Sequence, residues 1–526
     1  MTLIDWIIVI AWVAGTSMVG LFYGRKVKSL DGYLLAGRKL SWWQVSAAQA
    51  ADQVDSSDFV GASGLGYRTG MTGLGVILSG QTIGFVALSR WVLPSLYKSG
   101  VYTNAEYMED RYTRELRVFS MVLQVLYRIV AIAIVVYTTA LMFQVVLGVE
   151  ELWTAILAAM AATVLYTFLG GQVSAVMASI PQMALILFCG ITLSVLVCGQ
   201  IGGLANLSEH FAATPELLRL GGYSEPGVPT WIYYLGMILT FSTYPLINQA
   251  VAQRALAARS QNHARLGTVC YPPVYWIFGS AVALVGLAGL AMEPGLSSSE
   301  ADRIYPSLMV RFLPEGLLGL GVAGMLVAAM STAAGIGTAV SGLLTIDLYR
   351  RFLRPDEADS HYLLVARLAS LAAIAAGTLL SFFIERMGGI VDFYVALTGT
   401  LFMPLMTPYL ALGLYPKASR RSGMTAVVLG AGLGLTLMVL DSQYAHSLGI
   451  GIPVWLGHSK WRPIWVFIIT WIGLIGQTWY DHRRRGIDVP TLAGGEDRVE
   501  ASWYQRPGFY EGLLLVVLGA VFWYGW

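Results

Sequence analysis

The chain has 526 residues, of which 56% are hydrophobic and only 12% are charged. Soluble domains carry about 25% charged residues, so this composition indicates a membrane protein. The net charge of +2 is small and excludes the strong positive charge that is typical of a nucleic-acid partner.

Enzymatic and nucleotide-driven functions find no support in the residue pattern. Cys189, Cys198 and Cys270 lie in or beside apolar runs and are typical of small buried side chains, not of a disulfide framework. The six histidines show no metal-ligand spacing, and no Walker-type phosphate loop is present. We therefore expect that the chain is neither an enzyme nor a nucleotide-driven pump.

Apolar runs of about 20 residues, each long enough to cross roughly 30 Å of hydrocarbon, recur along the chain. They predict an all-α polytopic membrane protein, a single transmembrane domain over residues 1–526 with about fourteen transmembrane helices. The first run contains Asp5 and lacks a basic leader, so we expect an uncleaved helix. The predicted spans are 3–23, 41–69, 72–96, 115–147, 151–170, 175–202, 230–252, 266–292, 315–348, 362–385, 388–414, 423–442, 462–481 and 510–526.

Lysine and arginine gather in alternate connections between these spans. The positive-inside rule places the basic set in the cytoplasm of a multi-pass protein of the plasma (inner) membrane. An even number of spans then places both termini on the extracytoplasmic side. The basic connections are 24–39, 109–117, 253–265, 349–354, 415–421 and 481–485, whereas 203–229 and 293–313 are poorer in basic residues.

The second span contains three aspartates, Asp52, Asp55 and Asp58, in the segment AADQVDSSDFV. A charged side chain at membrane depth costs about 3 kcal/mol on insertion scales, so such residues usually face a cavity, an ion or a partner charge. Ser56 and Ser57 lie between the aspartates. This pattern predicts a helix that is interrupted at a polar site.

Landmarks along the chain resemble the solute:sodium symporter family, whose bacterial members include galactose, sialic-acid and proline transporters. Their order and spacing match over about residues 1–480. The matching segments are DGYLLAGRKLSWW (31–43), FVGASGLGY (59–67), NQAVAQRALAARS (248–260) and TIDLYRR (345–351).

The resemblance implies the five-plus-five inverted-repeat fold of LeuT-type transporters. It implies a first helix and cytoplasmic loop in 1–40, repeats in 41–202 and 230–414, and peripheral helices in 423–526. One helix thus precedes the repeats and three follow them. In this architecture, broken helices place unwound backbone around a site at the membrane midplane.

The resemblance also implies a sodium site. The family's ligands fall on the carbonyl oxygens of Ala51, Val54 and Ala328 and on the hydroxyls of Ser331 and Thr332. Sodium is a hard cation that takes oxygen ligands, so these groups suit it as the coupling ion. The structural alternative is that the two hydroxyls bond to a carbonyl one turn earlier in their own helix.

A second sodium site is not expected. Family members with two sites carry an aspartate where this chain has Ser179, and hydroxyls where it has Ala334 and Gly335. These departures predict one sodium ion per transport cycle.

The family's solute contacts fall on Gln53, Asp55, Asp58 and the gating tyrosine position Tyr244. Positions that hold sugar-binding side chains in the galactose transporters fall on Phe241 and near Tyr275, so that sugar pattern is not kept.

Arg128 is a further buried charge, placed much like a carboxylate-binding arginine of the sialic-acid transporters. Its structural alternative is a salt bridge to Asp52, Asp55 or Asp58. Three carboxylates, one guanidinium and one sodium leave about one negative charge, which a protonated carboxyl or a cationic solute would cancel. We therefore expect a solute with a charged amino group, such as an amino acid or other zwitterion, with a sugar as the alternative.

The leading interpretation is a sodium-coupled symporter that imports a small polar solute by alternating access. Proton coupling through Asp52, Asp55 and Asp58 is the main alternative. A passive channel or a membrane sensor is less favoured, because the short soluble segments leave no room for a sensor's kinase region. Membrane lipid is the expected surrounding, and the sequence does not specify an oligomeric state.

Overall fold

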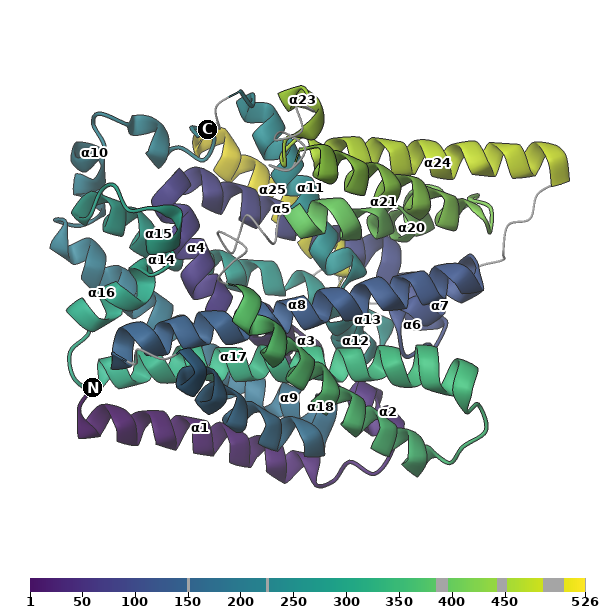
Figure 1. Cartoon of the computed structure of the whole chain (residues 1–526), viewed down its shortest axis with the longest axis horizontal. Coiled ribbons are helices and arrows are strands. Elements are labelled where there is room, and N and C mark those ends of the chain that lie inside the picture. Colours follow the sequence, from purple (N-terminus) through teal and green to yellow (C-terminus); the bar gives the residue numbers. More distant parts are fainter. Residues whose placement is uncertain (149–151, 224–226, 385–395, 442–451, 486–505, 526) are drawn as a thin grey trace.

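The computed structural model describes the chain except residues 149–151, 224–226, 385–395, 442–451, 486–505 and 526 (Figure 1). The described residues form helices joined by short connections, with an isolated parallel bridge between Leu40 and Ala258. This arrangement confirms the all-helical prediction.

The first half of the chain forms the helices that build most of the core. In chain order they are α1 (Leu3–Gly24), α2 (Leu30–Leu35), η1 (Ala36–Arg38), α3 (Trp42–Gln53), α4 (Ser56–Thr69), α5 (Met71–Ala87), η2 (Leu88–Val92), α6 (Leu93–Lys98), α7 (Asn104–Arg111), α8 (Arg114–Leu147), α9 (Leu152–Gln200), η3 (Leu204–Asn206), α10 (Leu207–His210), η4 (Pro215–Leu218), α11 (Thr230–Ile247) and α12 (Gln249–Leu256).

The second half completes the core and adds peripheral helices. These are α13 (Gln261–Val269), α14 (Tyr271–Met292), α15 (Ser298–Ala301), α16 (Ile304–Phe312), α17 (Leu317–Gly342), η5 (Leu343–Leu353), α18 (Asp359–Ile384), η7 (Thr398–Phe402), α20 (Met403–Leu414), α21 (Ser422–Leu440), α23 (Val454–Gly457), α24 (Arg462–Arg485) and α25 (Pro507–Gly525).

Nine helices within the described ranges are long and apolar enough to cross a membrane, which supports a multi-pass membrane protein. Two predicted spans, 41–69 and 230–252, consist of shorter halves that this criterion does not count. Part of the predicted span 388–414 lies outside the described residues. The count of fourteen spans and the inverted repeat therefore stay predictions.

The predicted spans 151–170 and 175–202 are joined without an intervening loop in α9. The helix bends at Gly171, whose φ of 51° is in the left-handed region. A Cβ atom at this position would lie about 2.5 Å from the Tyr33 ring, so glycine meets both the conformation and the close contact.

Two helix breaks face the centre of the molecule. The first separates α3 from α4 at Val54 and Asp55, which are extended, so the interruption predicted in the second span is present. The second separates α11 from α12 at Asn248, whose side chain accepts a hydrogen bond from the backbone N–H of Ala250 at 2.8 Å.

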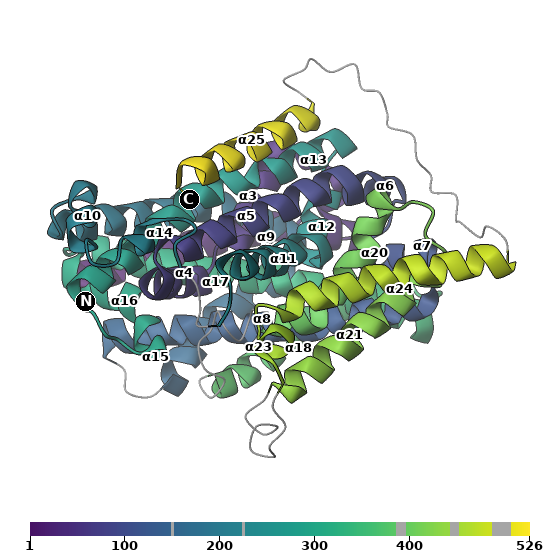
Figure 2. The ribbon, with the colours of Figure 1, turned by 90° about the horizontal axis from the view of Figure 1, so that it is seen from above.

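Helix α17 lies in the middle of the bundle and packs against α1, α8, α9 and α18 (Figure 1). It also contacts α3 and α4, the two halves of the first broken helix. The peripheral pair α21 and α24 lies on one side, while α25 lies along α5 and α13 on another (Figure 2). The broken helices and α17 thus bound the same interior region.

Candidate functional site

The break between α3 and α4 is held by two of the aspartates. The Asp55 side chain accepts a hydrogen bond from the backbone N–H of Ser57 at 2.7 Å, and the Asp58 side chain accepts one from the backbone N–H of Asp55 at 3.1 Å. This reciprocal cap satisfies N–H groups at the start of α4. Both carboxylates also lie at the positive end of the helix dipole, which stabilises their charge.

The same break releases carbonyl groups. In an uninterrupted helix the carbonyl of Ala51 would accept from the N–H of Asp55, but that N–H donates to Asp58. Val54 is extended, with φ −116° and ψ 106°, so its carbonyl lies outside the regular helix. The two first-helix carbonyls predicted as sodium ligands are therefore at the point where the helix pattern is broken.

Helix α17 presents hydroxyls to this point. Thr332 donates to the Asp52 carbonyl at 3.1 Å, and the hydroxyls of Ser331 and Ser179 are 3.2 Å apart. Ser179 donates to the carbonyl of Ala175 at 2.6 Å, so Ser331 is the donor in the serine pair. Both predicted ligand hydroxyls thus reach other helices and not the carbonyl one turn earlier.

This hydrogen-bond direction matters because a hydroxyl has one proton and two lone pairs. Ser331 and Thr332 each give the proton to a neighbour, so their lone pairs stay available to a cation. Ala328 lies one turn earlier on α17 and is buried. The structure brings the two predicted ligand-bearing segments together, and the five-oxygen sodium site itself stays a prediction.

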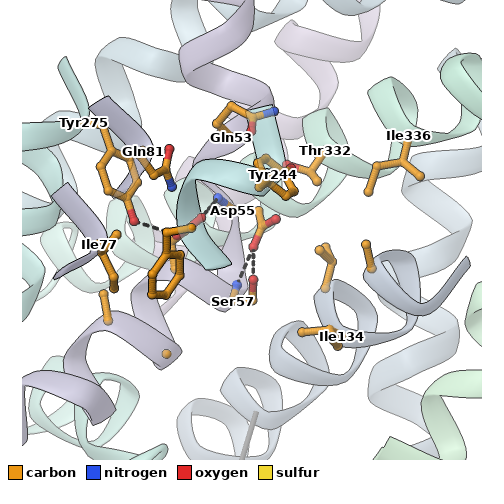
Figure 3. Close-up of a pocket in the computed structure, with 16 residues that line it drawn as sticks. Gln53, Asp55, Ser57, Ile77, Gln81, Ile134, Tyr244, Tyr275, Thr332 and Ile336 are labelled. Atoms are coloured by element: carbon orange, nitrogen blue, oxygen red, sulfur yellow. Dashed lines mark hydrogen bonds between the residues drawn. The ribbon is translucent and has the colours of Figure 1, made fainter. Parts of the chain in front are cut away.

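A cavity of about 120 Å³ lies beside the break (Figure 3). Predicted solute residues Gln53, Asp55, Asp58 and Tyr244 all line it. Thr332 also lines it, so the cavity adjoins the predicted sodium ligands. The other lining residues are Ser57, Gly61, Ala62, Ile77, Gln81, Ala131, Ile134, Val135, Phe241, Tyr275 and Ile336.

One side of the cavity is polar, and only some of its residues were predicted from the sequence. Tyr275 donates to the Asp58 carboxylate at 3.0 Å, and Gln81 accepts from Tyr271 at 3.3 Å. Figure 3 shows Tyr275 and Gln81 on one side of the cavity, with Thr332 on the other. Gln81 was missed, although a lone glutamine within an apolar span was the signal that could have identified it.

Arg128 does not appear among the residues that line the cavity. Its guanidinium carbon lies 5.0 Å from the centre of the Tyr127 ring and 5.2 Å from that of Tyr244. Nε and Nη2 of Arg128 have no hydrogen-bond partner among the described residues. Arg128 therefore contacts the cavity wall from behind, through Tyr244.

Arg254 is the functional candidate that the sequence analysis missed. Its Nη1 lies 2.7 Å from Oδ2 of Asp52, and both side chains are 1% exposed. Arg254 belongs to the basic connection 253–265, which the positive-inside rule places in the cytoplasm, but in the structure it lies in the short helix α12 and is buried. Asp52 thus pairs with Arg254, and the alternative of a salt bridge from Arg128 to Asp52, Asp55 or Asp58 is not seen among the described residues.

The positions that form a second sodium site in other family members have different surroundings in this chain. Ser179 bonds to Ser331, and Ala334 is buried. A Cβ atom on Gly335 would overlap the Asp52 carboxylate and the Arg254 guanidinium. The ion pair therefore lies against α17 where a larger residue would not fit.

Comparisons with known proteins identify the family of the chain. A family model described as "Sodium:solute symporter family" matches residues 33–430. The sodium/glucose cotransporter of Vibrio parahaemolyticus is 24% identical, and the alignment covers 99% of each chain. The sodium/myo-inositol cotransporter 2 of Bos taurus is 28% identical over 81% of this chain and 68% of its own length.

Solved structures of transporters share the fold. A sodium-coupled sialic acid symporter in a substrate-bound outward-open state superposes with a TM-score of 0.75 at 18% identity, covering 91% of this chain and 98% of that one. The nucleobase-cation-symport-1 family transporter Mhp1 gives a TM-score of 0.54 at 14% identity, covering 86% and 95%.

Proposed function

Because the chain belongs to the sodium:solute symporter family, we propose that it imports one sodium ion together with one neutral, hydroxyl-rich solute by alternating access. Sodium-coupled symport of a small polar solute follows from the family. The neutral solute and the single ion are the finer parts of the proposal. Both are supported by the count of buried charged side chains around the cavity.

The charge count changes once Arg254 is included. When ionised, Asp52, Asp55 and Asp58 supply three negative charges, and the buried side chains of Arg128 and Arg254 supply two positive charges. One sodium ion completes neutrality, since a buried charge must be paired or neutralised. The expectation of a cationic solute used a count without Arg254, so its main argument no longer holds.

The chemistry of the cavity wall suits a solute that donates hydrogen bonds. In their ionised form Asp55 and Asp58 can only accept, while Gln53, Gln81, Ser57 and Tyr275 add groups that accept and donate. A polyhydroxyl compound presents several donors without adding charge. Glucose and myo-inositol, which appear in the names of the two relatives above, are of this class.

We place the sodium ion at the carbonyl oxygens of Ala51, Val54 and Ala328 and the hydroxyls of Ser331 and Thr332. The freed carbonyl of Ala51 and the outward donation of both hydroxyl protons support this placement. Sodium there would tie α3 to α17, next to the cavity. Release of the ion would then weaken the contact between these two segments.

The test is uptake of labelled myo-inositol and glucose by purified protein in lipid vesicles. We expect accumulation under an inward sodium gradient, and no accumulation when an ionophore collapses that gradient. Uptake driven by a proton gradient in sodium-free buffer would instead support the alternative of proton coupling through the aspartates.

A matched set of amino acids and amines tests the solute class in the same vesicles. Sodium-dependent uptake of an amine or a zwitterion with no response to any polyol would overturn the neutral-solute proposal. It would restore the earlier expectation that Asp55 and Asp58 hold an amino group and that Arg128 holds a carboxylate.

A further inference from the structure

We propose that Arg254 supplies a fixed positive charge beside the predicted sodium site. This charge balances Asp52 and limits transport to one cation taken from solution in each cycle. The inference rests on the proposed function and deepens it. It assigns a coupling role to a residue of α12 that lies outside the predicted ligand set and the cavity wall.

The ion pair is enclosed by protein. Asp52 Oδ2 accepts from Arg254 Nη1 at 2.7 Å and from Gln53 Nε2 at 2.9 Å, and Arg254 Nη1 also lies 3.2 Å from the carbonyl of Ala250. Asp52 Oδ1 and Arg254 Nε and Nη2 have no hydrogen-bond partner among the described residues. Few polar groups therefore surround the pair to screen its charges, and each charged side chain is stabilised mainly by the other.

The pair lies within one helical turn of the predicted sodium ligands on both helices. Asp52 directly follows Ala51, and its own carbonyl accepts from Thr332. Gly335, which contacts both charged groups, is three residues after Thr332 and four after Ser331, on the same face of α17. Any change in the charge of the pair must therefore act on a cation at the predicted site.

This arrangement predicts opposite effects for the two partners. Without Arg254, Asp52 becomes an uncompensated buried carboxylate, which recruits a second sodium ion from solution. Without Asp52, the guanidinium is uncompensated and repels the sodium ion. A role in packing alone would not produce effects of opposite sign on cation binding.

The experiment measures the sodium dependence of uptake in vesicles for the wild type, Arg254→Gln, Asp52→Asn and the double variant. For the wild type we expect a Hill coefficient near one. For Arg254→Gln we expect a Hill coefficient clearly above one. For Asp52→Asn we expect the half-saturating sodium concentration to rise about tenfold or more.

The double variant Asp52→Asn/Arg254→Gln removes both charges at nearly constant shape. We expect it to return to a Hill coefficient near one, with a sodium affinity closer to the wild type than that of Asp52→Asn. Arg254→Lys keeps the charge, so it should also keep the single-sodium dependence. Arg68→Gln is the matched control, because Arg68 forms a 3.0 Å ion pair with Asp302 away from the cavity wall.

Several outcomes would overturn the inference. One is a folded Arg254→Gln protein with the same sodium dependence as the wild type. If Arg254→Gln does not fold, a folded double variant with single-sodium transport supports charge balance. If neither variant folds, the two side chains are needed for packing, and the inference is overturned. Absence of any sodium stimulation in the wild type would instead reject the proposed function, so the two failures are distinguishable.

Discussion

Ser331 and Thr332 differ from Ser341, another buried hydroxyl of α17, in where their protons go. Ser341 donates to the carbonyl of Thr338, three residues earlier on its own helix, at 2.8 Å. Ser331 and Thr332 donate to α9 and α3. Ser341 therefore bonds within its helix, whereas Ser331 and Thr332 join helices, although all three are the same kind of small polar residue in the sequence.

We predict that Ser331→Ala and Thr332→Ala each raise the half-saturating sodium concentration at least tenfold, equivalent to about 1.4 kcal/mol. The reason is the loss of one oxygen ligand from the proposed site. Sodium titration of uptake measures the effect, and the unfolding temperature reports on the fold. Ser341→Ala is the control, and an equal loss of sodium affinity in that variant would contradict the assignment.

The hydroxyl of Tyr275 offers a test on the solute side. Tyr275→Phe removes the 3.0 Å bond to Asp58 and leaves the Asp58 cap of α4 in place. We predict that the solute KM rises about five- to tenfold, as expected for loss of about 1 kcal/mol, while the half-saturating sodium concentration changes little.

The control for this variant is Tyr67→Phe. Tyr67 donates to the carbonyl of Glu293 at 2.6 Å and does not line the cavity. A KM that stays at the wild-type value in Tyr275→Phe, or an equal rise in Tyr67→Phe, would remove Tyr275 from the solute site.

Residue types predicted the site only where an unusual residue lay in an apolar run. Asp55 and Asp58 were identified in this way, and both line the cavity. Arg254 was missed because it begins a basic run, and a count of basic residues cannot tell a buried arginine from a cytoplasmic one. Gln81 and Tyr275 depend on how α5 and α14 pack around α4, which one sequence does not specify.

At the scale of elements, the α3–α4 break is predictable because polar residues interrupt an apolar span. The break between α11 and α12 is less marked, since only Asn248 and Gln249 follow a long apolar segment. Its position is settled by tertiary contacts: the N–H of Gln249 donates to Gln124 at 3.1 Å, and Asn104 donates to the carbonyl of Ile247 at 2.8 Å. Such contacts between distant segments have no local sequence signal.

Glu109 links helix α7 to its neighbours through two ion pairs. This carboxylate accepts from Arg117 on α8 at 2.7 Å and from Arg351 on η5 at 2.6 Å. Burial opposes the charged form, but the hydrogen bonds from Arg351 and Arg117 outweigh it and hold the pKa of Glu109 below its usual range. Charged Glu109 therefore contributes stability above the unfolded-state pKa of about 4.3, and this stability is lost as pH falls through the lower folded-state value.

We predict that Glu109→Gln lowers the free energy of unfolding by about 1 kcal/mol at pH 7, because both arginine contacts lose their charge partner. The difference from the wild type should shrink below about pH 4, where the carboxylate becomes protonated in both states. Unfolding curves at several pH values measure it. Glu357→Gln, in the exposed pair with Arg354, is the control, and a difference that persists unchanged at low pH would contradict the argument.

At the scale of the whole molecule, hydropathy predicted the helical class and most helix positions, since apolar length is what a bilayer requires. The predicted first span, 3–23, agrees with α1 to within one residue at its end. Hydropathy could not place the kink between 151–170 and 175–202 at Gly171, where the non-helical backbone and the close approach of Tyr33 both favour glycine. It also could not reveal which helices surround the cavity.

The two termini can be placed relative to the connections by their hydrogen bonds. Near the N-terminus, the Asp5 carboxylate accepts from the N–H groups of Gly316 and Gly319 at 2.8 and 2.9 Å. Near the other end, the carbonyl of Gly525 accepts from Leu220 at 2.8 Å. Leu220 lies in 203–229, and Gly316 closely follows 293–313, which are the connections poor in basic residues.

Both termini therefore lie at the face that is opposite to the basic connections, and the positive-inside rule predicts that this face is extracytoplasmic. A protease-cleavable tag at either terminus should be cut by protease added to intact cells or spheroplasts. The same tag inserted after Asp356, beside the basic connection 349–354, should be cut only after the membrane is opened. Protection of the terminal tags with cleavage of the internal one would reverse the predicted orientation of the chain in the membrane.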